Sequence, residues 1–272
     1  MITSADIVNG LGQMPLVGTV LRWYAHQYKE GSVVRITRGY ASGMKWRRHH
    51  RYVNGYWTGI YEVDLQKAIV NALNRGGVFY DVGANAGFFT VLAAKCVGAS
   101  GRVFSFELLP ENARSLREQI EINSLNQCKL VEVALSSQSG LQTFVRTEHN
   151  AYGHLLRSDE QPNETEGELI RTMKLDEFVL CHPHPDVIKI DVEGAETEVL
   201  AGAHSLLGSK RPPVLIIELH GDEKARSVEA TLLSFGYCLK DLSGRHLIDG
   251  VGSQRHILCH PLIAEESSAT GV

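Results

Sequence analysis

Four acidic residues fall at the ends of predicted strands, where carboxylates can bind a ligand or accept a proton. Asp81 ends the stretch VFYD, Glu107 ends GRVFSFE, Asp191 ends DVIKID and Glu218 ends PPVLIIE. In an open α/β sheet, ligands bind outside the carboxyl ends of the strands. We therefore expect these four carboxylates to lie at one edge of a sheet, where they would contribute to binding and to chemistry.

The loop after the first of these strands predicts a nucleotide-binding turn, but the acidic Asp81 stands just before it. Gly83 and Gly87 stand in the loop, and Asn85 stands between them. Asn tolerates a left-handed backbone better than most residues. A dinucleotide would place its pyrophosphate over this turn, where Asp81 would repel it. S-adenosylmethionine carries an ammonium group, a sulfonium and a ribose but no phosphate, so Asp81 favours it. Glu107 has the spacing expected of an acid that binds the ribose hydroxyls.

The composition is that of an ordinary soluble globular protein. The chain has 272 residues, of which 43% are hydrophobic and 21% are charged. The formal net charge of -4 argues against binding to duplex nucleic acid. The five cysteines are scattered, which argues for a reducing compartment, and a cytoplasmic location is expected. We find no signal-peptide pattern and no apolar run of about 20 residues, the length needed to span a bilayer.

Predicted strands and helices alternate from Val78 onward. The predicted strands cover 77–83, 101–107, 128–136, 141–147, 186–194, 212–221, 237–242 and 255–260. The predicted helices cover 61–77, 85–98, 110–125, 173–180, 195–207 and 224–236. A polar loop is expected from the end of the fourth strand through about residue 168. We expect an α/β fold with a doubly wound, Rossmann-like sheet, a terminal antiparallel hairpin and a mixed N-terminal extension.

The chain divides into three predicted segments. Residues 1–77 form the extension, which would cap the substrate and the cofactor; residues 78–263 form the S-adenosylmethionine-binding domain; and residues 264–272 form a flexible tail. The extension contains the basic run KWRRHHR. This run is either a solvated surface or a binding site for an anionic acceptor, such as an acidic glycan, or for a membrane surface. Trp46, Tyr56 and Trp57 could stack on sugar faces or pack in the interior.

Six motifs occur in a characteristic order. They are FYDVGANAGFFT, FSFELLPEN, VALSS, MKLDEF, IKIDVEGAETEVLAGA and LIIELH. This order resembles that of FkbM-type S-adenosylmethionine-dependent methyltransferases, from about residue 52 to residue 220. The second motif departs from the family pattern at Leu108, where a proline is common. The resemblance implies a class I methyltransferase sheet and O-methylation of a sugar, a glycolipid or a polyketide-type natural product.

The resemblance also implies a set of cofactor-binding residues. The set is Tyr61, Glu62, Asp81, Gly83, Asn85, Gly87, Phe88, Glu107, Asn112, Val133, Ala134 and Asp191. The residues from Asp81 to Phe88 would hold the methionine end, and Glu107 would hold the ribose. Asn112, Val133 and Ala134 would approach the adenine. Tyr61 and Glu62 would close over the cofactor from the N-terminal side.

Methyl transfer from a sulfonium needs alignment of the reactants and removal of a proton from the acceptor hydroxyl. The candidates for this chemistry are Asp191, Glu193, Glu218 and His220. Glu218 and His220 are two residues apart on a predicted strand and therefore share a face. His154 belongs to the polar loop, which could cover the site.

The main expectation is chemistry without a metal ion. In a metal-assisted alternative, Asp191, Glu218 and His220 would hold a divalent cation that lowers the pKa of the acceptor hydroxyl. Full activity after exhaustive chelation would contradict this alternative.

Other functions remain open from the sequence. The chain could methylate RNA or protein, or it could bind S-adenosylmethionine without turnover. A dinucleotide-dependent oxidoreductase is disfavoured by Asp81. The expected acceptor is a small molecule or a glycan, and a homo-oligomer is left open.

Overall fold

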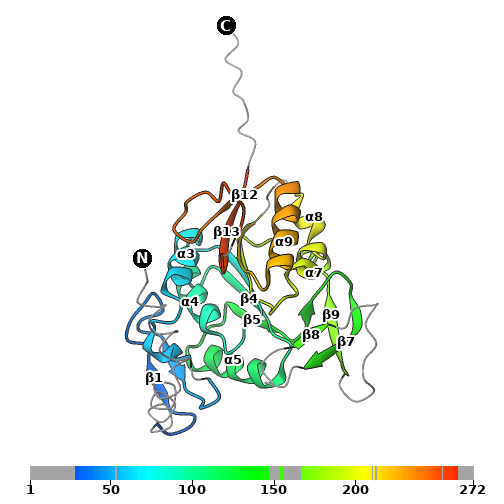
Figure 1. The fold of residues 1–272 in the computed structure, drawn as a ribbon. Helices are drawn as coiled ribbons and strands as arrows, with labels where there is room; N and C mark the ends of the chain where they lie inside the picture. The colour runs from blue at the N-terminus through cyan, green and yellow to red at the C-terminus, as the bar shows by residue number, and fades with distance from the viewer. Residues whose placement is uncertain are drawn as a thin grey trace, which may run out of the picture. The chain divides into compact units, whose positions relative to one another are not determined.

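The computed structural model describes residues 28–52, 54–146, 153–155, 167–209, 211, 213–252 and 254–262. The chain folds into two compact units, residues 1–134 and 135–272. Figure 1 labels their helices and strands. The predictions for the first 27 residues and for the tail, 264–272, lie outside the described residues.

The first unit begins with short elements that carry the aromatic residues of the extension. Strands β1 (Val33–Arg35) and β2 (Lys45–Arg47) pair antiparallel, and a 3-10 helix, η1 (Tyr56–Thr58), follows. Helix α3 (Val63–Ala72) buries Leu65 and Ile69 on one face, as its apolar spacing predicts. The extension contains both strands and helices, which confirms the predicted mixed secondary structure.

Three parallel strands form the sheet of the first unit. They are β3 (Val78–Val82), β4 (Arg102–Phe106) and β5 (Cys128–Val131), and β4 pairs with both others. Helix α4 (Phe88–Val97) buries eight of its ten side chains, which explains its apolar sequence. Helix α5 (Pro110–Ile122) begins at Pro110, because proline suits the first turn of a helix.

The second unit contains the remaining strands. β10 (Val187–Ile190) and β11 (Val214–Glu218) are parallel and almost fully buried, which fits their continuous apolar runs. β13 (His256–Pro261) pairs antiparallel with both β11 and β12 (Tyr237–Lys240), and this confirms the terminal hairpin. With parallel strands in each unit and this antiparallel pair, the fold is α/β with a mixed central sheet, as predicted.

The helices of the second unit are α6 (Leu175–Phe178), α7 (Glu196–Ala201), α8 (His204–Leu207) and α9 (Asp222–Ser234). The predicted helix over 195–207 is therefore two helices. At the break, Gly202 approaches the backbone so closely that an added Cβ would lie 2.1 Å from the Ser136 carbonyl oxygen. This close approach explains the glycine.

The prediction of a polar loop through about residue 168 is wrong at residues 153–155 and 167–168, and the rest of that segment lies outside the described residues. Strands β8 (Gly153–Leu155) and β9 (Gly167–Met173) lie in and after this segment, and both pair antiparallel with β7 (Gly140–Arg146). The single strand predicted over 128–136 is also divided, into β5 and β6 (Ala134–Leu135). β9 pairs with β7 across the intervening residues, whereas β8 follows its partner β7 closely along the chain.

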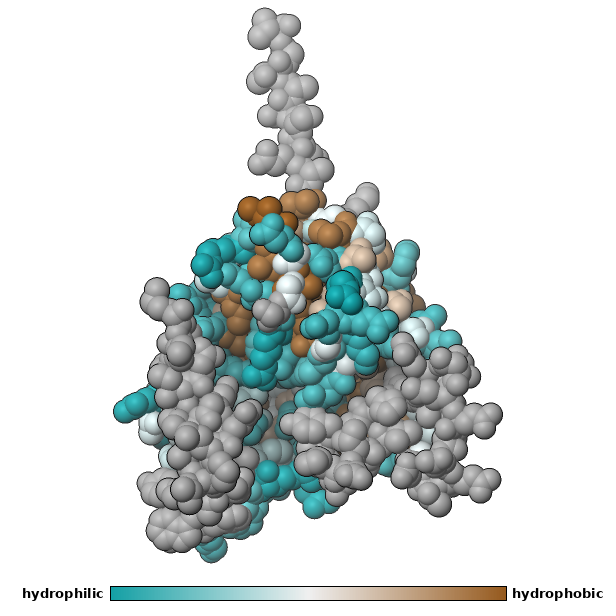
Figure 2. Space-filling model, viewed as in Figure 1, coloured by the Kyte–Doolittle hydropathy of each residue, from teal (hydrophilic) through white to brown (hydrophobic). Residues whose placement is uncertain are grey.

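The described surface is mostly hydrophilic on the face in Figure 2, with apolar side chains gathered around β12 and β13 of the second unit. Exposed apolar residues of this unit include Leu233, Ile248 and Leu262. Among the described residues, no helix is both long and apolar enough to cross a membrane.

Candidate functional site

The loop between β3 and α4 has the backbone that its sequence predicts. Gly83, Asn85 and Gly87 all have positive φ, at 74°, 49° and 93°. Asn85 accepts a hydrogen bond at its Oδ1 from the Ala86 N–H, 2.7 Å away, which stabilises this conformation. An added Cβ at Gly87 would lie 2.4 Å from Leu116 Cδ1. The loop therefore needs these residue types for its shape.

Glu107 joins this loop to the end of β4. Its Oε2 accepts from the Asn85 N–H and its Oε1 accepts from the Leu109 N–H, both at 2.8 Å. The side chain is buried, and burial raises the pKa of Glu107 although these backbone hydrogen bonds oppose the shift. A carboxylate oxygen has more than one acceptor site, so both oxygens can still accept from a ligand hydroxyl.

Asp81 is placed differently from Glu107. It is fully buried, and its Oδ2 accepts from the Thr90 hydroxyl at 2.6 Å. That hydroxyl oxygen also lies 2.8 Å from the Ser105 hydroxyl. Asp81 therefore supports the loop from the interior, where a charge on its carboxylate would act on a ligand only through the intervening protein.

Asn112 lies close to Glu107, and its predicted place beside the adenine stays a prediction. It is buried, its side chain hydrogen-bonds to Glu107, and its Oδ1 accepts from the Tyr52 hydroxyl at 2.8 Å. Burial raises the pKa of Tyr52 to about 12, so this phenol stays protonated as a donor. Val133 is half-buried and Ala134 is buried after the end of β5.

Aromatic side chains cover the start of α4. The Tyr61 ring contacts the rings of Phe88 and Phe89 at centroid distances of 5.7 and 5.8 Å. Tyr56 stacks on Phe88 at 5.5 Å. Glu62 precedes α3 with a φ of 43°, an unusual value for a residue other than glycine. The structure thus brings the predicted Tyr61 to the predicted Phe88.

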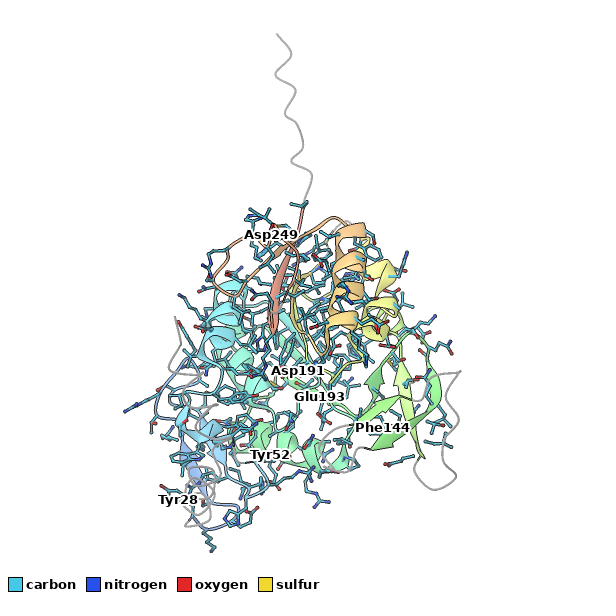
Figure 3. The ribbon with its side chains drawn as sticks, in the orientation of Figure 1. Tyr28, Tyr52, Phe144, Asp191, Glu193 and Asp249 are labelled. Carbon is cyan, nitrogen blue, oxygen red and sulfur yellow. The ribbon has the colours of Figure 1, made fainter. Side chains whose placement is uncertain are left out.

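The second unit holds a cluster of two acids and a histidine. Asp191, Glu193 and His220 each offer an oxygen or nitrogen atom, and these atoms lie within 4.8 Å of one another. Asp191 and Glu193 lie side by side after β10 (Figure 3). Glu193 has a φ of 52°, and strained backbone of this kind gathers at functional sites.

Glu196 fixes the orientation of His220. This acid begins α7 and is fully buried, with its Oε1 2.8 Å from His220 Nδ1 and accepting from the Gly194 N–H at 2.9 Å. The other ring nitrogen of His220 lies 3.3 Å from Glu193 and 3.6 Å from Glu218. The imidazole is therefore surrounded by carboxylates. The helix dipole alone favours an acid at the N-terminus of α7, but Glu196 also holds His220 in place.

The charges in this cluster shift the pKa values of its members. Burial alone would lower the pKa of His220, but the hydrogen bond to Glu196 and the nearby carboxylates raise it to about 9. Burial raises the pKa of Glu193 to about 7, and the neighbouring carboxylates add to this effect while His220 opposes it. At neutral pH, His220 is therefore an imidazolium, and Glu193 is close to its midpoint.

Glu218 is held by the residue just before β13 and by the first residue of β13, the strand that pairs with β11. Its Oε1 accepts from Arg255 Nε at 2.7 Å, and its Oε2 lies 3.2 Å from His256 Nε2. Burial would raise the pKa of Glu218, but His256 and Arg255 lower it. Glu218 is thus a fixed negative charge beside His220 at neutral pH.

This geometry bears on the metal-assisted alternative. The group that contains Asp191 and His220 is completed by Glu193, whereas the alternative names Glu218 in its place. A histidine ligand must be neutral to bind a metal ion. The carboxylates around both ring nitrogens of His220 favour its protonated form when no metal ion is bound, so a cation there would have to displace this proton.

Sequence reasoning missed several residues of this site. Lys189 is a buried lysine on β10, and its Nζ lies 3.2 Å from Asp191 Oδ2. The sequence does contain a signal for Lys189. It lies within the apolar run VIKID, two residues before Asp191, and therefore on the same face of the strand. Arg255 and His256 gave no local signal. His154 lies in β8 opposite Val145, and the structure describes only its backbone.

The family model of the methyltransferase FkbM domain matches residues 81–239. The chain belongs to this family. A hexuronic acid methyltransferase from Haloferax volcanii is 30% identical over 174 residues, which are 63% of this chain and 67% of that protein. The family confirms the resemblance of the six motifs: the protein is an S-adenosylmethionine-dependent methyltransferase, and S-adenosylmethionine is its cofactor.

Two solved structures are similar at low identity. The FkbM methyltransferase from Methylobacillus flagellatus is 13% identical with a TM-score of 0.41, and the match covers 92% of this chain and 60% of that one. An S-adenosylmethionine-dependent O-methyltransferase from Thermotoga maritima is 12% identical with a TM-score of 0.45, with 89% and 80% covered. The family assignment rests on the sequence matches.

The donor set of the first unit fits this cofactor. Glu107 offers two carboxylate oxygens at the end of β4, and Asp81 adds a second negative charge beneath the loop. Carboxylates complement ribose hydroxyls and a cationic methionine end, whereas a pyrophosphate would be repelled. When bound, S-adenosylmethionine supplies a methyl group on a sulfonium that is already activated for transfer.

Proposed function

We propose that this FkbM-family protein is an O-methyltransferase that acts on a hydroxyl of a sugar, a glycolipid or a polyketide-type natural product, with a sugar as the favoured acceptor. The observation that carries the proposal is the cluster of Asp191, Glu193 and His220, which combines a carboxylate of pKa about 7 with a fixed positive charge. An alcohol needs such a group, because it is a poor nucleophile until it loses its proton. The Haloferax volcanii relative, named for a hexuronic acid, supports a sugar acceptor.

In the proposed mechanism, the first unit binds the donor. Glu107 accepts from the ribose hydroxyls, and the loop from Gly83 to Gly87 holds the methionine end. Phe88 and Tyr61 exclude water from the same region with the surrounding aromatic rings. Alignment and exclusion of water are the main contributions that a protein can make to this kind of displacement.

In the second unit, Glu193 accepts the proton of the acceptor hydroxyl. Its side chain is 41% exposed, so an acceptor can reach it, and its pKa matches the operating pH of a general base. His220 is less suited to this step because its pKa of about 9 keeps it protonated. It instead stabilises the Glu193 carboxylate, and Glu196 keeps the ring in place. Asp191 orients the acceptor hydroxyl.

Transfer of labelled methyl groups tests the proposal. The purified protein and labelled S-adenosylmethionine would be incubated with a panel of glycosides and polyketides, with total RNA and a protein extract as parallel acceptors. The proposal predicts label in one or more glycosides. Label in RNA or protein alone would contradict it, and binding of S-adenosylmethionine without transfer to any acceptor would favour a non-catalytic binding module.

A further inference from the structure

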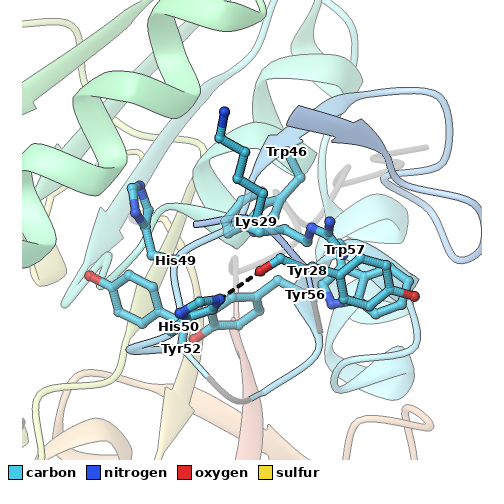
Figure 4. A pocket seen from close by; sticks show the side chains of 9 residues that line it. Tyr28, Lys29, Trp46, His49, His50, Tyr52, Tyr56 and Trp57 are labelled. Atoms are coloured by element: carbon cyan, nitrogen blue, oxygen red, sulfur yellow. Dashed lines mark hydrogen bonds between the residues drawn. The ribbon is translucent and has the colours of Figure 1, made fainter. Parts of the chain in front are cut away.

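A cavity in the first unit lies outside the site described above. About 390 Å³ of empty space lies there with open solvent included, the enclosed part has room only for a small polar group, and the lining residues come from the extension. They are Tyr28, Lys29, Trp46, Arg48, His49, His50, Tyr52, Tyr56 and Trp57 (Figure 4). Five of the nine are aromatic, four are basic or histidine, and none is acidic. The lining therefore suits an anion attached to a flat apolar group.

Two of the basic residues have no carboxylate partner in the described part of the chain. His49 lies 2.7 Å from Glu30 and 2.8 Å from Glu118, and His50 also lies 3.3 Å from Glu30, so acids already face both histidines. Among the described residues, neither Arg48 nor Lys29 has an acid within ion-pair distance. The positive charge available to a ligand thus comes from these two side chains.

Arg48 is oriented by its neighbours. Its guanidinium lies 3.6 Å from the centre of the Tyr28 ring and 5.4 Å from that of Trp57. Its Nε and Nη2 donate to the Ser32 hydroxyl at 3.2 and 2.8 Å. Its Nη1 is buried and has no hydrogen-bond acceptor within the ranges that the structure describes. A buried cationic donor without an acceptor is costly, and a ligand oxygen would remove this cost.

The cavity adjoins the start of α4. Tyr56 and Trp46, which line the cavity, contact Phe88 at 5.5 and 6.0 Å. Phe88 directly follows the cofactor loop. A ligand in the cavity would therefore share an aromatic wall with the loop that binds the donor.

We propose that this cavity is an acceptor subsite that binds the carboxylate of an acidic sugar, with Arg48 as the anchor, Lys29 at the exposed rim and Trp57 against the sugar ring. The proposal rests on the proposed function, because it names the class of sugar. A planar guanidinium forms paired hydrogen bonds with a carboxylate. A doubly charged phosphate is commonly met by a cluster of arginines, whereas this cavity offers one, and Glu30 and Glu118 stand nearby.

Direct binding tests the subsite without any need for turnover. Methyl glucuronoside and the matched neutral methyl glucoside would be titrated into the full-length protein and followed by tryptophan fluorescence, since two of the three tryptophans line the cavity. We expect saturable binding of the glucuronoside only. Arg48→Gln should weaken it about 10- to 100-fold, the effect of losing hydrogen bonds to a charged group. Arg48→Lys should retain part of the affinity.

Arg51→Gln is the matched control, because Arg51 belongs to the same basic run but pairs with Glu111 at 3.0 Å outside the cavity. It should bind the glucuronoside as the wild type does. Equal glucuronoside affinity in Arg48→Gln and wild type, with both folded by circular dichroism, would overturn the proposal. Inorganic phosphate that binds more tightly than the glucuronoside would overturn the choice of a carboxylate.

Methyl transfer separates this proposal from the proposed function. With both glycosides as acceptors, Arg48→Gln should lower kcat/KM for the acidic one and leave the neutral one unchanged within about twofold. No transfer to any sugar, with intact Arg48-dependent binding of the glucuronoside, would contradict the O-methyltransferase function and support the subsite. Transfer to neutral sugars only, with no binding of the glucuronoside, would support the O-methyltransferase function and contradict the subsite.

Discussion

At the scale of single residues, Glu107 has two tasks. It fixes the Asn85 and Leu109 amides with its two oxygens, and it is the proposed acceptor for the ribose hydroxyls. Because Glu107 is buried, a substitution should disturb both the conformation of the loop and the binding of the cofactor. This double role distinguishes it from the acids of the following helix, α5.

Replacing Glu107 with alanine should weaken S-adenosylmethionine binding by about 1–3 kcal/mol, because hydrogen bonds to a charged group are lost. Isothermal titration calorimetry would measure the change. Glu111→Ala is a suitable control, since Glu111 is a partly exposed acid in the first turn of α5 that pairs with Arg51. Unchanged affinity in Glu107→Ala would exclude the ribose role.

The cluster around Glu193 makes a prediction about pH. The base must be deprotonated, so kcat/KM should rise with pH through about 7; the imidazolium of His220 must be charged, so kcat/KM should fall above about 9. Because the groups interact, the two midpoints belong to the cluster as a whole. Steady-state kinetics from acidic to alkaline pH would show this bell-shaped curve.

Glu193→Gln should lower kcat about 100-fold or more and remove the lower limb of that curve, while leaving the affinity for S-adenosylmethionine unchanged within about twofold. His220→Gln should remove the upper limb. If Glu193→Gln retains the wild-type profile, the proton acceptor is a different group.

The sequence predicts some of these residues better than others. Glu107, Asn85 and Gly87 belong to one strand, loop and helix pattern, and local spacing is sufficient to relate them. The partners of Glu218 could not be predicted in this way, because Arg255 lies 37 residues later and reaches it only through the pairing of β13 with β11. The role of Glu196 could not be predicted from local spacing either, because its contact with His220 depends on how α7 lies against the end of β11.

At the scale of elements, Gly87 determines how closely α4 approaches α5. Gly87→Ala should destabilise the fold by about 1–3 kcal/mol, because a Cβ would collide with Leu116. Urea denaturation would measure the free energy of unfolding. Gly43→Ala is the matched control, since Gly43 has a similar φ of 87° but no atom within 4 Å of an added Cβ. Equal losses in the two variants would mean that backbone strain, not the collision, explains the glycine.

The element boundaries show where local pattern is insufficient. The apolar runs of β3, β10 and β11 identify buried parallel strands without ambiguity. In contrast, β9 is mostly exposed along its first half, so its sequence resembles a polar loop until its pairing with β7 is known. Strands of this kind owe their stability to cross-strand partners that a single sequence does not reveal.

At the scale of the whole molecule, the two units carry different parts of the proposed reaction. The residues proposed to bind the donor, apart from Asp191, lie within residues 1–134, and the proposed proton-transfer residues lie within 135–272. The predicted boundary between residues 1–77 and 78–263 separates expected functions and not compact units. The role of the extension as a cap stays a prediction. The cavity of the extension gives that prediction a specific test.

Chelation tests whether the reaction needs a metal ion. Because His220 is held in its protonated form, activity should be unchanged within about twofold after exhaustive treatment with EDTA and dialysis. Loss of activity that Mg²⁺ or Mn²⁺ restores would instead support the metal-assisted alternative.

The proposed destination of the methyl group, a sugar oxygen, can be observed by NMR. The protein would be incubated with ¹³C-methyl-labelled S-adenosylmethionine and a glycoside accepted in the panel, and the product would be examined by ¹³C–¹H correlation spectroscopy. We predict one new methyl ether resonance with a long-range coupling to a single ring carbon of the sugar. A labelled methyl group on nitrogen, on carbon or on a carboxylate as an ester would contradict the proposed function.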